Sequence, residues 1–363
     1  MTVDTRTVDT RTRDRTGRVD FGRRMLVLRR SRVRVRIDLH VVLVCAALAA
    51  LTIAVALLAL ATGSYQLSAA QVVSALTGGE PGIVHDIVVE WRLPRVAATL
   101  FFGAALGVSG AMFQSLTRNP LASPDVIGFA TGSYTGALLV ILVISGSYAT
   151  VAAGALLGGI ATALAVYVFA YRQGVQGFRL IIVGIAVSAM LHSLNTWLIL
   201  KADLDVAMAA AVWGAGSLNA VTWEQVLIGG TVIVVLLVLA GLLSRPMRQM
   251  ELGDDAAASQ GVSVGAVRLA IVVVGVALIA TVTAAAGPIA FVALAAPQIA
   301  RRLARTAGIT LAPAAFVGAL LLGTADFVAQ HIVPTPLPVG VITVMIGGGY
   351  LGWLLFTEAR RRL

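Results

Sequence analysis

The residues that could carry out bond chemistry are few and lie far apart in this sequence. Cys45 is the only cysteine, so neither a disulfide nor a zinc site built on several thiolates can form within one chain. The four histidines lack the spacing of metal ligands: His40, His85, His192 and His331. We therefore expect no metal site and no catalytic residue.

Lysine is almost absent, and this bears on nucleotide chemistry. Of the 27 basic residues 26 are arginine, and the single lysine is Lys201 in "LILKADLD". A P-loop needs a lysine directly after glycine to reach the β- and γ-phosphates of a nucleotide. If ATP drives this protein, another chain must bind it.

Arg92 and Arg95 form a closely spaced pair of charged residues at the start of an apolar run. They lie three apart in "WRLPR", on either side of Leu93-Pro94, where a long apolar run begins. In one interpretation both side chains extend to lipid phosphates and end a membrane span. In the other they form an exposed cationic pair for carboxylates of an external partner. The charge pattern by itself leaves both interpretations open.

The elements that position these arginines are membrane helices. Hydrophobic residues make up 58% of the 363 residues, charged residues only 12%, and the mean hydropathy is +0.92. The apolar residues gather in blocks of about 20, the length of a membrane-spanning helix. We predict an all-α polytopic membrane protein with about ten spans, at 40–62, 93–113, 125–145, 149–171, 179–201, 224–244, 266–286, 288–305, 311–331 and 338–357. Pro288 and Pro297 predict that the eighth is short or broken.

The distribution of basic residues predicts the orientation. With the N-terminus inside, 24 of the 27 basic residues fall on the cytoplasmic side, and only Arg92, Arg95 and Lys201 fall outside. Both termini are then cytoplasmic. Residues 1–38 hold 12 Arg and 5 Asp and predict a disordered cytoplasmic tail, with lipid or nucleic-acid binding as the alternative. The transmembrane domain is expected to follow at 39–358, and residues 359–363 to form a basic cytoplasmic end.

One cytoplasmic loop is long enough to suggest a contact with another protein. In this segment, residues 245–268, Gly253 and Gly261 bracket a two-turn helix, and Asp254 or Asp255 can cap its start. Loops in compact membrane proteins are usually shorter. A contact site is therefore favoured over a plain solvated loop.

Two polar residues lie at membrane depth in the fifth span. His192 and Asn195 belong to "LHSLNTW", and intramembrane polar groups often line a cavity. The alternative for Asn195 is an interhelical hydrogen bond. Asp326, near the outer end of the ninth span, is expected to cap a helix or to hydrogen-bond a neighbour.

Five motifs in order resemble the FecCD family of ABC-importer permeases, over about residues 39–358. They are "WRLPR" (91–95), "SGAMFQSLTRNPLASPDVIGFATGS" (109–133), "ELGDDAAASQGV" (251–262), "AAGPIAFVALAAPQIARRL" (285–303) and "LPVGVITVMIGGGYLGWLL" (337–355). The resemblance implies the type II ABC importer permease fold, with ten helices per subunit. It also implies three protein partners: an ATPase homodimer inside, a second permease, and an extracytoplasmic substrate-binding protein outside. ATP and Mg²⁺ would be held by the ATPase, and no cofactor by this chain.

The resemblance also assigns roles to residues. Arg92 and Arg95 match the family's external arginines, which meet glutamates of the binding protein. The ATPase-coupling helix is matched by the segment from Glu251 to Val262, with Glu251, Leu252, Gly253, Asp254, Ala257 and Gly261 as its candidate residues. His192 and Asn195 are candidates for the translocation pathway, which the fifth span borders in the family.

Three positions depart from the family pattern. Gln298 stands where members often have histidine, and "GGGYLG" (347–352) lacks the proline common in the last span. Gln330 and His331 occupy the stretch where some members have a third external arginine, which favours a heterodimer over a homodimer of permeases.

The implied cargo is a ferric siderophore. "GPIAFVALAAPQIARRL" is most similar to permeases of ferric enterobactin-like systems, which indicates a catecholate, with cobalamin and haem as alternatives. An ion-coupled secondary transporter is the alternative of another class. It is disfavoured because Asp125 and Asp326 lie near span ends and no glutamate lies mid-span. A passive channel would need no coupling segment, and a membrane enzyme would need a nucleophile–base or metal constellation. Membrane lipid is the expected surrounding, and nucleic acid is not expected as a partner.

Overall fold

The computed structural model describes residues 25–30, 33–79, 82–125, 127–143, 147–170, 177–308, 310–332 and 336–362. Ten of its helices coincide with the ten predicted spans: α1 (Leu39–Ala61), α4 (Leu93–Thr117), α5 (Phe129–Val143), α6 (Tyr148–Ala170), α7 (Gly177–Lys201), α9 (Trp223–Glu251), α11 (Val264–Ala286), α12 (Val292–Ala304), α13 (Leu311–His331) and α14 (Val339–Arg362). By length and composition, seven helices of the described part can cross a membrane, and α5 and the start of α14 are shorter apolar helices. The chain is therefore a multi-pass membrane protein.

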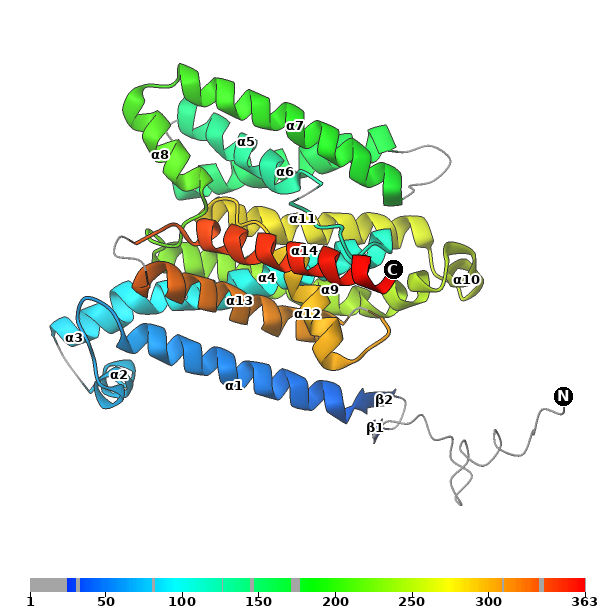
Figure 1. Cartoon of the computed structure of the whole chain (residues 1–363), viewed down its shortest axis with the longest axis horizontal. Coiled ribbons are helices and arrows are strands. Elements are labelled where there is room, and N and C mark those ends of the chain that lie inside the picture. Colours follow the sequence, from blue (N-terminus) through cyan, green and yellow to red (C-terminus); the bar gives the residue numbers. More distant parts are fainter. Residues whose placement is uncertain are drawn as a thin grey trace.

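Short helices connect the spans at both ends of the bundle. They are α2 (Ala69–Leu76), α3 (Ile83–His85), the π-helical segment η1 (Asp86–Arg92), α8 (Leu204–Gly214) and α10 (Asp254–Ser259). The segment η1 leads directly into α4, so the two arginines lie where a π-helix becomes an α-helix. In Figure 1, α2, α3 and α8 lie at one end of the long helices and α10 at the other.

The region before α1 differs from the predicted disordered tail. Strand β1 (Met25–Arg30) pairs antiparallel with β2 (Val33–Asp38), with Val27 opposite Arg36. The sequences "MLVLRR" and "VRVRID" are rich in β-branched and aliphatic residues, and the second alternates valine with arginine, a pattern that favours strands. The remainder of the predicted tail, residues 1–24, lies outside the described residues. At the other end α14 extends through Arg362, so the basic end is helical up to that residue.

The centre of the bundle is formed by α4 and α11, the most buried of the long helices. Figure 1 shows α5, α6, α7 and α8 gathered on one side of this centre and α1 and α13 on the other. Close packing depends on small residues. Gly103 and Gly107 of α4 lie against the backbone of α13, and Gly132 and Gly136 of α5 lie against the backbone of α6. In lipid, where no hydrophobic effect drives helix association, such close approach supplies the packing energy.

Gly110 of α4 gives a direct test of this packing. A Cβ atom there would overlap the backbone carbonyl of Ala293 in α12. We expect Gly110→Val to lower the free energy of unfolding by about 1–3 kcal/mol, because overpacking forces the backbones apart. The measurement is the melting temperature in detergent. Gly241→Val on α9 is the matched control, since nothing lies within 4 Å of a Cβ at Gly241. Equal melting of the two variants would contradict this packing.

Candidate functional site

Arg92 is held by the turn of chain that follows α1. Its guanidinium donates hydrogen bonds to the carbonyl oxygens of Leu60 and Tyr65, both at 2.6 Å. Gly63 in this turn has a φ of 150°, and a Cβ there would lie 2.6 Å from Nη2 of Arg92, so glycine leaves room for the side chain. Both acceptors are neutral, so these two bonds fix the guanidinium without compensating its charge.

Arg95 makes a two-pronged ion pair with Asp326 of α13. Its Nε donates to Oδ2 of Asp326 at 2.8 Å and its Nη2 donates to Oδ1 at 2.6 Å. The side chains are only 17% and 7% exposed, respectively. The structure thus differs from the predicted exposed pair: Arg95 is largely buried because a carboxylate 231 residues later lies opposite it. Of the two roles predicted for Asp326, the hydrogen bond to a neighbour is confirmed.

Both arginines line a cleft of about 360 Å³, called the outer cleft because the sequence predicts these arginines outside. Trp91 and Tyr65, each with an exposed side chain, lie on its rim, and Gln330 and His331 of α13 complete one wall. The His331 ring stacks on Phe327 with the ring centroids 4.5 Å apart. The stretch that lacks a third arginine therefore contributes a polar, aromatic wall to the same cleft.

The loop between α9 and α11, which is predicted to be cytoplasmic, contains the helix predicted for it. Helix α10 is bracketed by Gly253 and Gly261, whose φ angles of 121° and 85° are left-handed conformations that favour glycine. The predicted capping is wrong, since Gly253 itself occupies the cap position and Asp254 and Asp255 lie in the first turn.

Asp254 ties α10 to two membrane helices. Its carboxylate accepts from Arg118, at the end of α4, at 2.8 Å and from Arg268 of α11 at 2.6 Å. Arg118 also donates to the carbonyl of Met250 at 2.7 Å. From the sequence these two arginines were recognised only as basic residues of the predicted cytoplasmic side. Their shared carboxylate was missed because it lies 136 residues from Arg118 and 14 residues from Arg268 along the chain. These two ion pairs therefore connect α10 to α4 and α11.

The candidate coupling residues differ in how far their side chains are exposed to solvent. Leu252 is 72% exposed, whereas Ala257 is fully buried. Glu251 accepts a hydrogen bond from Ser115 of α4 at 3.0 Å. Leu252 is therefore available to an external partner, and Ala257 instead holds α10 against the bundle.

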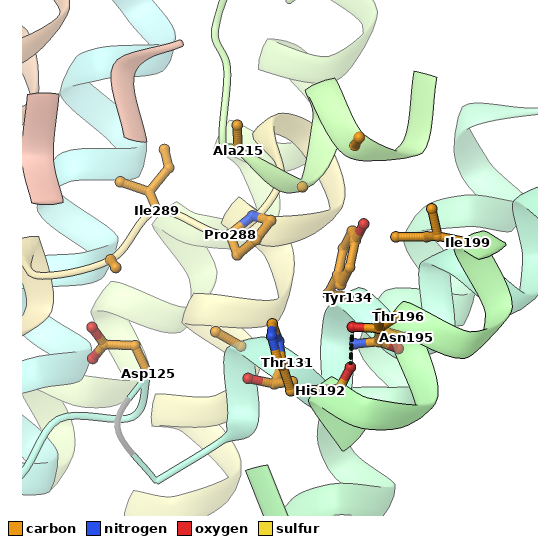
Figure 2. Close-up of a pocket in the computed structure, with 14 residues that line it drawn as sticks. Asp125, Thr131, Tyr134, His192, Asn195, Thr196, Ile199, Ala215, Pro288 and Ile289 are labelled. Atoms are coloured by element: carbon orange, nitrogen blue, oxygen red, sulfur yellow. Dashed lines mark hydrogen bonds between the residues drawn. The ribbon is translucent and has the colours of Figure 1, made fainter. Parts of the chain in front are cut away.

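A cavity of about 480 Å³ lies between α5, α7, α8 and the connection from α11 to α12. His192, which is exposed, and Asn195, which is 2% exposed, both line it. Neither amide atom of Asn195 has a hydrogen-bond partner among the described residues, so the interhelical bond considered as the alternative is not present there. Figure 2 shows Asn195 and Asp125 on different walls of the cavity.

Asp125 joins two interrupted segments at membrane depth. Its Oδ2 accepts from the backbone N–H of Phe291 at 3.0 Å, at the start of α12. The chain between Gly287 (φ 72°) and Phe291 (φ 68°) is not helical, and α12 then runs without interruption through Pro297, so the eighth span is short, as predicted, and not broken. Sequence reasoning placed Asp125 near a span end and missed this contact. The signal was the unsatisfied N–H that a helix start must pair.

Replacing Asp125 tests this contact. We expect Asp125→Leu to destabilise the protein by about 1–3 kcal/mol, because the Phe291 N–H would be left unpaired in an apolar environment. Asp125→Asn, which keeps an acceptor oxygen, is the control and is expected to melt close to wild type. Thermal unfolding in detergent measures both, and equal stability of the Leu variant and wild type would contradict the role of the contact.

The bundle and its sites define a class of protein. A short helix with a non-helical entry beside a cavity, an arginine cleft at one end and an exposed helical loop at the other are typical of a membrane transport subunit. The described residues contain no group of three or more His, Cys, Asp or Glu that could hold a metal ion. The chain belongs to the FecCD transport family, whose model matches residues 51–357.

Individual relatives agree with this assignment. The chain is 50% identical to the ferric enterobactin transport system permease protein FepG of Escherichia coli (strain K12), over 84% of this chain and 92% of the relative. It is 36% identical to the siderophore transport system permease protein YfhA of Bacillus subtilis (strain 168), over 74% and 81%. A solved structure described as an inward-facing metal-chelate type ABC transporter has a TM-score of 0.75 at 26% identity, covering 87% of this chain and 99% of that one.

Proposed function

We propose that this chain is the permease subunit of an ATP-driven importer that moves a ferric siderophore of the catecholate type across the cytoplasmic membrane. The observation that supports it most strongly is the 50% identity to a ferric enterobactin permease over nearly the full length of both chains. Both termini are proposed to be cytoplasmic, in accordance with the positive-inside distribution of arginine.

On the outer side, the proposed partner is an extracytoplasmic substrate-binding protein. The cleft lined by Arg92 and Arg95 is its proposed docking site, and carboxylates of the partner would face the arginines. Complementary charge of this kind steers encounter and sets the register of docking more than it adds affinity.

On the inner side, the proposed partner is a homodimer of ATPase subunits that binds ATP and Mg²⁺, while this chain binds no cofactor. The absence of a P-loop lysine supports a separate ATPase. Exposed Leu252 and the short helix α10 are the proposed contact, with Glu251, Gly253 and Gly261 shaping the loop and Asp254 relaying its movement to α4 and α11.

The pathway is proposed to run beside α7, past His192 and Asn195, between this subunit and a second permease of the family. A heterodimer is proposed because Gln330 and His331 stand where some relatives have an arginine. Transport then consists of a change in relative stability of inward- and outward-open states, driven by the ATPase.

Growth under iron limitation tests the cargo. A strain deleted for this gene is supplied with ferric enterobactin, a ferric hydroxamate, haem or, in a cobalamin-dependent background, cobalamin. We expect the deletion strain to lose growth only when ferric enterobactin is the iron source, and we expect the plasmid-borne gene to restore it. Loss of growth on haem or cobalamin instead would contradict the proposed cargo. Uptake by vesicles that contain only this chain and an ion gradient would contradict the ATP-driven mechanism.

A further inference from the structure

The charged residues that line the outer cleft do not have equivalent surroundings. Among the described residues that line it, Arg92, Arg95 and Asp326 carry charge, which gives these residues a net charge of +1. Arg95 and Asp326 neutralise each other at 2.6 Å, whereas Arg92 donates its hydrogen bonds to backbone carbonyls. The uncompensated positive charge of the cleft therefore belongs to Arg92.

Displacing Asp326 from Arg95 would be expensive. The Asp326 side chain is 7% exposed. Leaving a carboxylate unpaired at such burial lowers the equilibrium constant for exchanging its partner by a factor of about 150 or more. An exposed ion pair with an incoming carboxylate returns a factor of about five at most. An external carboxylate therefore cannot exchange for Asp326, and Arg95 stays paired when a partner docks.

Arg92, in contrast, is prepared for an external anion. Two of its five N–H donors are used by carbonyls that hold the guanidinium in place, and the other three remain. A cation fixed in this way loses little side-chain entropy on binding. Trp91, which is 64% exposed, and Tyr65, which is 49% exposed, flank it with aromatic surface of the kind that dominates protein interfaces.

We propose that the two outer arginines have separate tasks. Arg92 receives the carboxylate of the docking partner, and the Arg95–Asp326 pair is an internal clamp between α4 and α13. Asp326 is thus a positioning residue: the clamp holds together the two walls of the cleft in which Arg92 is presented. This inference rests on the proposed function, since it assumes that a substrate-binding protein docks at this cleft.

The test compares a neutral replacement of the clamp with the loss of Arg92. The purified transporter in nanodiscs, with its ATPase and second permease, is titrated with the substrate-binding protein of the same transport system. We expect Arg92→Gln to weaken docking at least tenfold and to flatten its dependence on salt. Arg95→Met and Asp326→Leu alone should each lower the melting temperature and weaken docking.

The double variant Arg95→Met/Asp326→Leu decides between the two roles. It removes one charge of each sign and leaves neither residue unpaired. We therefore expect its melting temperature and the salt dependence of docking to return to the wild-type values, and its docking affinity to lie within threefold of wild type. Docking as weak as in Arg92→Gln, in a double variant that melts normally, would overturn the proposal and make Arg95 a docking residue. Tighter docking by Asp326→Asn would overturn it in favour of carboxylate exchange.

Two further outcomes remain distinguishable. If the double variant fails to insert, the charge swap Arg95→Asp/Asp326→Arg restores the clamp in reverse; retained docking supports the proposal and lost docking overturns it. If the wild-type transporter binds no binding protein at all, the proposed function fails rather than the division of tasks.

Discussion

Replacing Arg92 by glutamate is expected to reduce siderophore uptake at least 100-fold while the permease still inserts into the membrane. Among the described residues that line the outer cleft, Arg92 carries the one charge without a paired opposite charge, and the substitution changes it from positive to negative. A partner carboxylate would then meet a carboxylate, and like charges at an interface cost several kcal/mol. The measurement is the initial rate of uptake in cells, normalised to the amount of permease in the membrane.

Lys201→Glu is the matched control for this prediction. Lys201 ends α7 and is the third basic residue predicted outside, so the variant makes the same change of charge away from the cleft. We expect its uptake to stay within twofold of wild type. Equal losses in the two variants would mean that the outer charge acts at long range and that Arg92 has no special place in docking.

Replacing Leu252 by aspartate is expected to uncouple ATP hydrolysis from transport by at least tenfold. Leu252 is 72% exposed beside α10, so the substitution leaves the bundle intact and removes apolar surface from the proposed ATPase contact. A carboxylate buried there without a partner is costly, so the contact weakens. Proteoliposomes measure the ratio of ATP hydrolysed to siderophore transported, and an unchanged ratio would contradict the assignment.

Variants at two other residues of the loop distinguish an effect on coupling from an effect on folding. Asp255→Ala alters an exposed residue in the first turn of α10 and is expected to preserve coupling. Ala257→Leu enlarges a fully buried side chain and is expected to lower the melting temperature, because α10 can no longer pack against the bundle. A stable but uncoupled Ala257→Leu variant would show that this face also meets the ATPase.

The positions of the spans were accessible from sequence because their signal is local. A helix in lipid must satisfy its own backbone groups within one continuous apolar segment, so length and hydropathy suffice to find it. The shortness of the eighth span was likewise visible in Pro288, since the structure begins α12 only at Val292, whereas Pro297 is accommodated inside that helix. The glycines around α10 were found because a left-handed backbone conformation favours that residue type.

The contacts of the charged residues were not accessible in the same way. Nothing near Arg95 in the chain indicates Asp326, and nothing near Phe291 indicates Asp125. The hairpin of β1 and β2 was missed for another reason: the high charge of residues 1–38 outweighed the short alternating pattern within it.

By itself, the sequence predicted a membrane protein of about ten spans that has no P-loop lysine, with an arginine pair on the outside and a short helix in a cytoplasmic loop. These properties depend on composition, local spacing and the asymmetry of charge across a bilayer. Only the tertiary structure decided that one arginine of the pair is neutralised by α13 and the other is not, and that Leu252 is exposed while Ala257 is buried. The reason is that pairing and burial depend on which helices meet in space, and helices distant in sequence meet according to packing that no single segment specifies.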